Sequence, residues 1–244
     1  MLTIAVARRR RMQNDSTGLR QRVAFYAVLI AGLFISRHVF CQETLQLAEP
    51  PNLGLFKQTI EYYVDSGAYQ RDLAAKIAEA KTYLTSRTAK GTREVMVLDI
   101  DETALSNLPY ERAFEFGYTS STWDEWIRKA EAPAIAPTLE LFKWARSQGT
   151  NVIFITGRKQ LAENLEMDPT VINLKKVGYD GWQALYFRPA GTKLPAAQLK
   201  NNRRAEIAAQ GYTIIACIGD QYSDLEGENI GRAFKLPNPF YYVP

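Results

Sequence analysis

Three short apolar runs, each followed at once by polar residues, constrain the fold of this 244-residue chain most strongly. The runs are Val95–Ile100, Asn151–Thr156 and Thr213–Ile218. Short, nearly continuous apolar segments bounded by glycine or polar residues are typical of strands buried on both faces of a parallel sheet. Helical patterns lie between the runs. The sequence therefore predicts an α/β fold with a doubly wound parallel sheet, Rossmann-like and built from right-handed βαβ units.

Helical spacing of apolar residues is clearest near the amino-terminal end of this region. Leu73, Ile77 and Leu84 are separated by charged residues within 68–88, and this pattern predicts an amphipathic helix inside an N-terminal helical segment, 55–90. The proline-containing residues 42–57 are expected to form an extended entry. The other expected helices cover residues 137–147, 160–176 and 199–210.

The segment 104–136, called here the insertion segment, separates the first apolar run from the next helical pattern. It is too long for a simple strand-to-helix connection. It is also rich in aromatic side chains, namely Tyr110, Phe114, Phe116, Tyr118, Trp123 and Trp126. We expect it to form a small helical lid over the strand ends.

Residues 1–41 read as a signal peptide. Arginines precede an uncharged run of 14 residues, Val23–Ser36. A helix of that length spans about 21 Å, which is shorter than the roughly 30 Å of a membrane's hydrocarbon core. Cleavage before Gln42 would yield a periplasmic or secreted protein with no stable membrane span. Retention of the leader as an anchor stays open, as does the choice between Met1 and Met12 as the start.

The distribution of charge excludes a nucleic-acid polymer as partner. The formal charge of +4 comes from the leader, which holds seven of the 30 basic residues and one of the 26 acidic residues. Residues 42–244 therefore carry 23 basic and 25 acidic side chains. The single histidine, His38, also lies in the leader, and this argues against histidine-dependent hydrolases and most zinc enzymes.

Acidic residues follow the first run directly. Ligands of open α/β sheets bind at the carboxyl ends of the strands, where Asp99 and Asp101 are expected. Two neighbouring like charges are tolerable when a divalent cation or a shared proton compensates them, and Mg²⁺ suits such oxygen ligands. An acidic helix N-cap is the alternative interpretation.

The second run ends in Thr156, Gly157 and Arg158, a hydroxyl, a flexible backbone and a guanidinium that suit an anionic group. The third is followed by Asp220 and Asp224, for which a capped helix start is again the alternative.

Lys200 opens the helical pattern before the third run. A solvated helix face is the alternative there, since Arg203 and Arg204 lie close by in the sequence.

The order of these residues resembles the four motifs of the haloacid dehalogenase superfamily of phosphatases. Further stretches resemble the acid phosphatase group that includes plant vegetative storage proteins and bacterial class B and C acid phosphatases, and the resemblance covers about 50–244. These stretches are Leu98–Tyr110, Trp123–Trp126, Gly178–Trp182, Gly219–Leu225 and Phe234–Tyr242. The resemblance implies one haloacid dehalogenase-like phosphatase domain over 42–244 and a small-molecule phosphomonoester substrate.

The resemblance also implies roles for the residues. Asp99 corresponds to the nucleophile that forms an aspartyl-phosphate, and Asp101 to the general acid/base, kept protonated partly by its acidic neighbours. Thr156 and Lys200 correspond to the groups that hold the phosphoryl oxygens, with Gly157 and Arg158 beside them. Mg²⁺ would be held by Asp99, the backbone carbonyl of Asp101 and Asp220, with Asp224 close by or holding a water. Relatives tend to have Tyr-Lys-Ser where this chain reads Leu199-Lys200-Asn201, so Lys193 is a second candidate.

Several functions compete at this stage. A storage or binding protein could share the whole fold, and the phosphatase could be a narrower 5′-nucleotidase. A receiver-type phospho-acceptor has its acidic pair before a later acceptor aspartate, which is a different order. A glycosyltransferase would use only the Asp-x-Asp pair. The aromatic residues of the insertion segment suggest stacking on an aromatic leaving group, with packing against helix 68–88 as the alternative. A homo-oligomer is left open.

Overall fold

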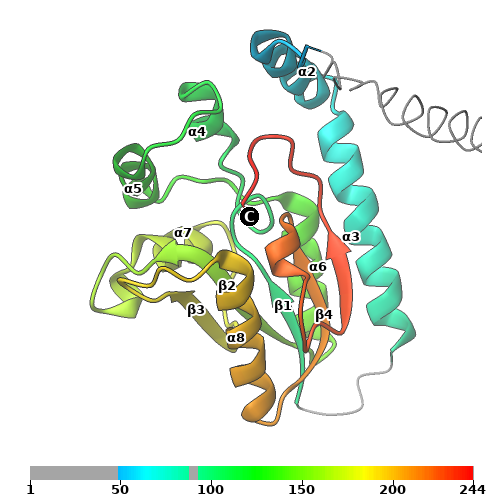
Figure 1. Cartoon of the computed structure of the whole chain (residues 1–244). Helices are drawn as coiled ribbons and strands as arrows, with labels where there is room; N and C mark the ends of the chain where they lie inside the picture. The colour runs from blue at the N-terminus through cyan, green and yellow to red at the C-terminus, as the bar shows by residue number, and fades with distance from the viewer. Residues whose placement is uncertain (1–48, 88–92, 244) are drawn as a thin grey trace, which may run out of the picture. The chain divides into compact units, whose positions relative to one another are not determined.

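Five strands form a single parallel sheet in the computed structural model, which describes residues 49–87 and 93–243 (Figure 1). The strand order is β3-β2-β1-β4-β5, with β1 at the centre. The strands are β1 (Glu94–Leu98), β2 (Asn151–Lys159), β3 (Ala184–Arg188), β4 (Thr213–Gly219) and β5 (Arg232–Lys235). Every neighbouring pair is parallel, which confirms the predicted doubly wound α/β fold.

The three predicted strands are the three inner ones, β1, β2 and β4. The two outer strands, β3 and β5, escaped prediction because an edge strand is only half covered and lacks a continuous apolar run. In β3 only Phe187 is buried, and in β5 only Phe234. Periodicity therefore located the centre of the sheet and missed its edges.

Alternate residues of the inner strands pack into two separate cores, as the pleat of a strand requires. Met96, Leu98 and Phe154 belong to the larger core, which includes residues of α3 (Ala68–Ser86), α6 (Ala136–Ser147) and α7 (Pro169–Lys176). Val95 and Val97 face the other way, toward Ile207 of α8 (Ala196–Ala209). The sheet is thus covered on both faces, and its carboxyl edge is left for ligands.

Two predicted boundaries are wrong. Helix α2 (Leu53–Asp65) replaces the end of the expected extended entry, because the Asn52 side chain caps it by accepting hydrogen bonds from the N–H groups of Gly54 and Leu55. Residues 42–48 of that entry lie outside the described residues.

The expected helix 160–176 is helical only in its second half. A 3-10 turn, η1 (Leu165–Met167), precedes α7, and α7 begins at Pro169. Proline lacks an N–H and disfavours helical geometry at the residue before it, so Asp168 becomes the N-cap and accepts from the N–H of Thr170.

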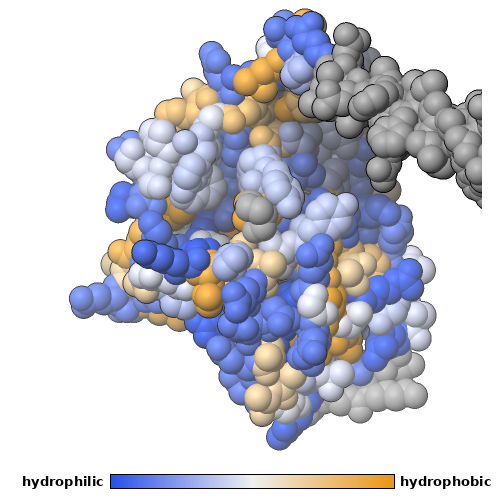
Figure 2. Space-filling view, in the orientation of Figure 1, coloured by the Kyte–Doolittle hydropathy of each residue, from blue (hydrophilic) through white to orange (hydrophobic). Residues whose placement is uncertain are grey.

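The insertion segment contains two short helices, α4 (Leu108–Ala113) and α5 (Ser120–Lys129). Figure 1 shows both beyond the carboxyl ends of the strands. The residues predicted as a signal peptide, 1–41, are not among those described. Within residues 49–87 and 93–243, no helix has the length and apolarity needed to cross a membrane. Figure 2 shows a mainly hydrophilic face with apolar surface at α2 and α4, where Leu53, Phe56 and Phe114 are exposed.

Truncating the Phe154 side chain should strongly destabilise the folded protein. Its ring is fully buried and lies 5.7–6.0 Å from the rings of Phe142, Tyr179 and Trp182. We expect Phe154→Ala to lower the free energy of unfolding by about 3–5 kcal/mol in urea denaturation, because the cavity it leaves cannot collapse fully. The matched control Tyr62→Ala, at a residue that is 76% exposed, should change it by less than about 0.5 kcal/mol. Equal losses in the two variants would contradict this account of the core.

Candidate active site

A tight turn follows β1 and presents two carboxylates at the carboxyl edge of the sheet. The N–H of Asp99 donates to the carbonyl of Ile218 in β4 at 3.0 Å, which holds the end of β1 in register. The chain then reverses, since Ala104 and Leu105 both donate to the carbonyl of Ile100 and Glu102 has a left-handed backbone, with φ of 49°. Asp99 and Asp101 thereby open onto the same space.

That space is a cavity of about 440 Å³, called here the site cavity. Six of the predicted site residues line it, namely Asp99, Asp101, Gly157, Arg158, Lys200 and Asp220. Thr156 and Asp224 do not line it and are buried. Lys193, the second candidate for the lysine, is exposed and is not among the lining residues, so the geometry favours Lys200.

Lys200 of α8 lies between two carboxylates. Its Nζ donates to Asp99 Oδ1 at 2.7 Å and also to Asp224 Oδ1. All three side chains are more than nine-tenths buried. Burial lowers the pKa of the Lys200 ammonium, but the charges of Asp224 and Asp99 outweigh burial and raise it above its ordinary value. The lysine is therefore a permanent cation beside Asp99.

Asp99, Asp220 and Asp224 form a triad that could hold a metal ion. One carboxylate oxygen from each lies within 4.8 Å of the others, and all three residues are buried. Burial raises the pKa of Asp99, and the charges of Asp224 and Asp220 raise it further against the opposing effect of Lys200. Burial and the charge of Asp224 likewise raise the pKa of Asp220 to about 6. These shifts reflect burial first and the mutual repulsion of the carboxylates second.

The donor set fits a hard divalent cation. Lys200 contacts only two of the triad's carboxylates, while Asp220 accepts hydrogen bonds from the neutral side chains of Thr103, Gln221 and Asn238. Three buried oxygen donors with one compensating ammonium leave charge that a divalent ion would neutralise.

Arg158 is engaged with Asp101. Its Nη2 donates to Asp101 Oδ1 at 2.7 Å, and its Nε lies 3.0 and 3.2 Å from the two carboxylate oxygens. Asn107 Nδ2 donates to the same carboxylate at 2.8 Å. The guanidinium bonds directly to the carboxylate, and the sequence alone did not indicate this contact. Arg158 lines the site cavity, but a substrate anion would have to compete with the Asp101 carboxylate for its guanidinium.

Sequence reasoning missed two buried acids. Glu102 accepts hydrogen bonds from the N–H of Asn107 at 2.6 Å and from the hydroxyl of Tyr241 at 2.7 Å, and burial raises its pKa to about 8. Glu111 of α4 lines the site cavity, and burial together with the charge of Asp101 raises its pKa to about 7. The available signal for Glu111 was an acid directly after the apolar and aromatic residues Leu108-Pro109-Tyr110.

Aromatic rings form much of the remaining wall. Phe116, Tyr118 and Trp123 come from the insertion segment, and Tyr241 and Tyr242 come from the C-terminal segment. Trp123 also lies 5.7 Å from the Arg158 guanidinium. Trp126 does not line the site cavity, and its Nε1 donates to Asn107 Oδ1 at 2.8 Å.

With this geometry established, comparison with known proteins identifies the family. Residues 48–244 match the family described as HAD superfamily, subfamily IIIB (acid phosphatase). The chain belongs to this family. Its activity class is therefore that of a phosphomonoesterase, as its sequence motifs predicted.

Individual relatives agree with this assignment. Vegetative storage protein 1 of Arabidopsis thaliana is 36% identical over 191 residues, covering 75% of this chain and 68% of that protein. Acid phosphatase 1 of Solanum lycopersicum is 34% identical over 189 residues, covering 75% and 72%. The class C acid phosphatase of Bacillus anthracis with tungstate bound superposes with a TM-score of 0.63 at 25% identity, covering 77% of this chain and 86% of that one.

The buried acids predict how stability depends on pH. In the unfolded chain the carboxyls of Glu102 and Glu111 titrate near 4.5, whereas in the folded protein their pKa values are about 8 and about 7. The folded state therefore binds more protons between about pH 4.5 and pH 8, and its stability falls as pH rises through that window. Urea denaturation in EDTA at pH 5, 6, 7 and 8 should show this decline. A free energy of unfolding that stays flat or rises over this range would contradict the assignment, and Glu111→Gln should remove part of the decline below pH 7.

Proposed function

We propose that the protein is an exported, Mg²⁺-dependent acid phosphatase that hydrolyses phosphomonoesters through an aspartyl-phosphate on Asp99. The observation that carries the proposal is the position of the Lys200 ammonium, 2.7 Å from Asp99 at the site cavity. Attack of a carboxylate on a phosphate dianion requires positive charge at the point of attack. Export rests on the leader, residues 1–41, and implies a periplasmic or secreted location.

The phosphoryl group would lie against Asp99 and Lys200. An oxygen of Asp99 attacks phosphorus in line, and the bond from phosphorus to the leaving oxygen breaks. Lys200 neutralises the phosphoryl oxygens, together with the backbone at Gly157. Thr156 Oγ1 accepts a hydrogen bond from the N–H of Arg158 at 3.1 Å, so the hydroxyl keeps its own proton to donate. Its role in phosphoryl binding follows from the family resemblance.

Asp99, Asp220 and the backbone carbonyl of Asp101 would hold Mg²⁺, with Asp224 beside them. When bound, the ion supplies further positive charge for the phosphoryl oxygens. The tungstate of the class C acid phosphatase from Bacillus anthracis supports an oxyanion site in this fold.

Asp101 would move the protons. The protonated carboxyl gives its proton to the leaving alkoxide, and the carboxylate so formed then takes a proton from the water that hydrolyses the aspartyl-phosphate, which restores the starting state. Arg158 and Asn107 orient its carboxylate through three bonds of 2.7–3.0 Å. This orientation suits the second step in particular, since a base must be ionised and aimed at the water.

A storage protein on the same fold is the second candidate, because relatives with that name exist. The complete set of Asp99, Asp101, Lys200 and Asp220 argues for the enzyme. A narrower 5′-nucleotidase is a special case of the first proposal, and the rings of Tyr118 and Trp123 at the site cavity would suit a nucleobase.

Replacing the nucleophile should abolish turnover. Asp99→Asn keeps the shape of the side chain but removes its negative charge, so hydrolysis of p-nitrophenyl phosphate should fall by at least about 10³-fold. Circular dichroism should show an intact fold. Residual activity near the wild-type rate would refute the aspartyl-phosphate mechanism, and an inactive wild-type protein with an intact fold would favour storage.

Metal binding can be measured without turnover. Mg²⁺ at about 100 times its Kd should raise the Tm of EDTA-treated protein by about 5–10 °C, because the ion binds only the folded state. Asp220→Asn should weaken this shift, whereas Asp180→Asn, at an exposed residue outside the site cavity, should leave it unchanged. Equal shifts in both variants would place the ion elsewhere.

A further inference from the structure

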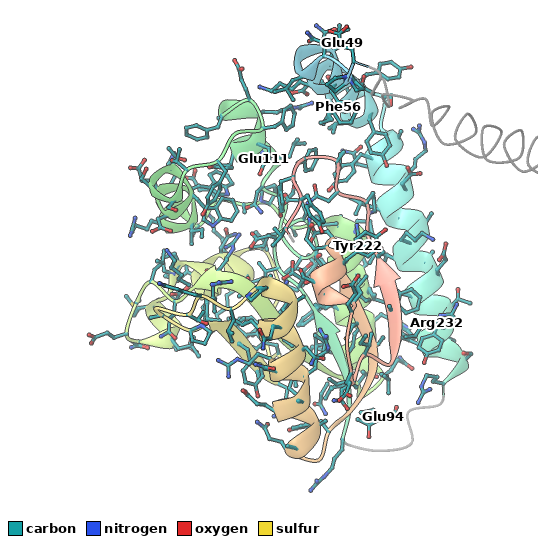
Figure 3. The ribbon with its side chains drawn as sticks, viewed as in Figure 1. Glu49, Phe56, Glu94, Glu111, Tyr222 and Arg232 are labelled. Atoms are coloured by element: carbon teal, nitrogen blue, oxygen red, sulfur yellow. The ribbon has the colours of Figure 1, made fainter. Side chains whose placement is uncertain are left out.

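Glu111 is a buried carboxyl that faces the site cavity without a partner. The residue is 4% exposed, and among residues 49–87 and 93–243 its side chain has no hydrogen bond or ion pair. Figure 3 shows it on the inner side of α4, toward the C-terminal segment. Its carboxylate oxygens keep some accessible surface, which opens on the site cavity. A carboxyl that is largely removed from water and has no protein partner would gain from a hydrogen-bond donor on a ligand.

The other acids that line the site cavity are already engaged. Asp99 bonds to Lys200, Asp101 bonds to Arg158, and Asp220 accepts from Gln221 and Asn238. Glu111 therefore differs from them in having no partner, and above its pKa of about 7 it offers two free acceptor oxygens to whatever enters.

The position of Glu111 indicates which part of a substrate it would meet. The N–H of Glu111 donates to the carbonyl of Asn107 at 2.9 Å, and Asn107 Nδ2 donates to Asp101 Oδ1 at 2.8 Å, so a single residue links the two acids. Asp101 is the group proposed to protonate the leaving oxygen. Glu111 lies on α4 of the insertion segment, which also supplies the wall residues Phe116 and Trp123, whereas Asp99 follows β1 and Lys200 lies in α8. Glu111 thus lies on the leaving-group side, where rings such as Phe116 and Trp123 supply apolar wall but no acceptor of comparable strength.

We propose that Glu111 is a specificity-determining residue that accepts a hydrogen bond from a hydroxyl or ammonium group on the leaving alcohol. The preferred substrates are then phosphomonoesters whose leaving group carries such a donor a few atoms from the ester oxygen. A site built around a buried acceptor discriminates against an analogue that lacks the donor, because the acceptor is left unpaired in that complex. The inference rests on the proposed phosphatase function and adds the substrate class.

The test uses three substrates of matched length: n-propyl phosphate, 3-hydroxypropyl phosphate and 3-aminopropyl phosphate. At about pH 8, where Glu111 is ionised, wild-type protein with Mg²⁺ should prefer at least one donor-bearing substrate over propyl phosphate by about tenfold in kcat/KM. Glu111→Leu should reduce that ratio to near one. Glu111→Gln should keep most of a hydroxyl preference, because the amide oxygen still accepts, and lose most of an ammonium preference, because the charge is gone. The comparison with 3-hydroxypropyl phosphate (the hydroxyl arm) and the comparison with 3-aminopropyl phosphate (the ammonium arm) thereby distinguish the two donors.

Glu115→Gln is the matched control. Glu115 belongs to the same segment, but its side chain is 85% exposed and pairs with Lys57 at 3.5 Å, so the three ratios should match wild type. If Glu111→Leu does not fold, as judged by its Tm, the nearly isosteric Glu111→Gln carries the test for the ammonium arm, and Glu111→Ala for the hydroxyl arm.

Two results would overturn the inference. One is normal turnover of p-nitrophenyl phosphate with no preference for either donor in the wild type. The other is an equal loss on all three substrates in the Glu111 variants. Failure of the wild type on every substrate, p-nitrophenyl phosphate included, would instead reject the proposed function and this inference with it.

Discussion

The buried contact of Lys200 with Asp99 and Asp224 is the interaction on which the rest of the site depends. It joins three elements that are distant in sequence: the end of β1, the start of α8 and the 3-10 turn η2 (Tyr222–Asp224). A buried ion pair adds little net stability, since desolvation offsets most of its attraction. Its value here is chemical, because it places a cation beside the one carboxylate that must approach a phosphate dianion.

The same helix supports the far side of this contact. Arg204 is 1% exposed, and its guanidinium donates to the carbonyls of Asp224 at 3.0 Å and Glu228 at 3.1 Å. Such donors satisfy carbonyls that a buried turn would otherwise leave unpaired. Helix α8 therefore supplies Lys200, which contacts the Asp224 carboxylate, and Arg204, which binds the Asp224 backbone.

Asn107 plays a comparable part on the other side of the site. Its Nδ2 donates to Asp101 and Glu102, and its Oδ1 accepts from Trp126 and Arg158. An amide that uses both its donors and its acceptor is locked in orientation. Asn107 thereby connects the insertion segment to Asp101, the proposed acid/base. Glu111 belongs to the same segment, and its N–H donates to the carbonyl of Asn107.

Much of this could be predicted from sequence. The inner strands β1, β2 and β4 followed from apolar runs, because a strand covered on both faces needs continuous apolar residues. Sequence patterns did not predict the edge strands β3 and β5, because half-exposed strands have only weak periodicity. They also did not predict the start of α7 or the cap of α2, because these depend on capping contacts. Motif order likewise selected Asp99, Lys200 and Asp220, which the structure brings to the site cavity, but it gave no information on the partners of Arg158.

The sequence by itself determined the fold class, the family and the residues at the strand ends, because these follow from local pattern and the order of motifs along the chain. Only the tertiary structure decided which charges meet: that Lys200 rather than Lys193 reaches Asp99, that Arg158 binds Asp101, and that Glu111 faces the site cavity alone. The physical reason is that pairing and burial depend on distances between segments far apart in the chain, and no local pattern encodes those distances.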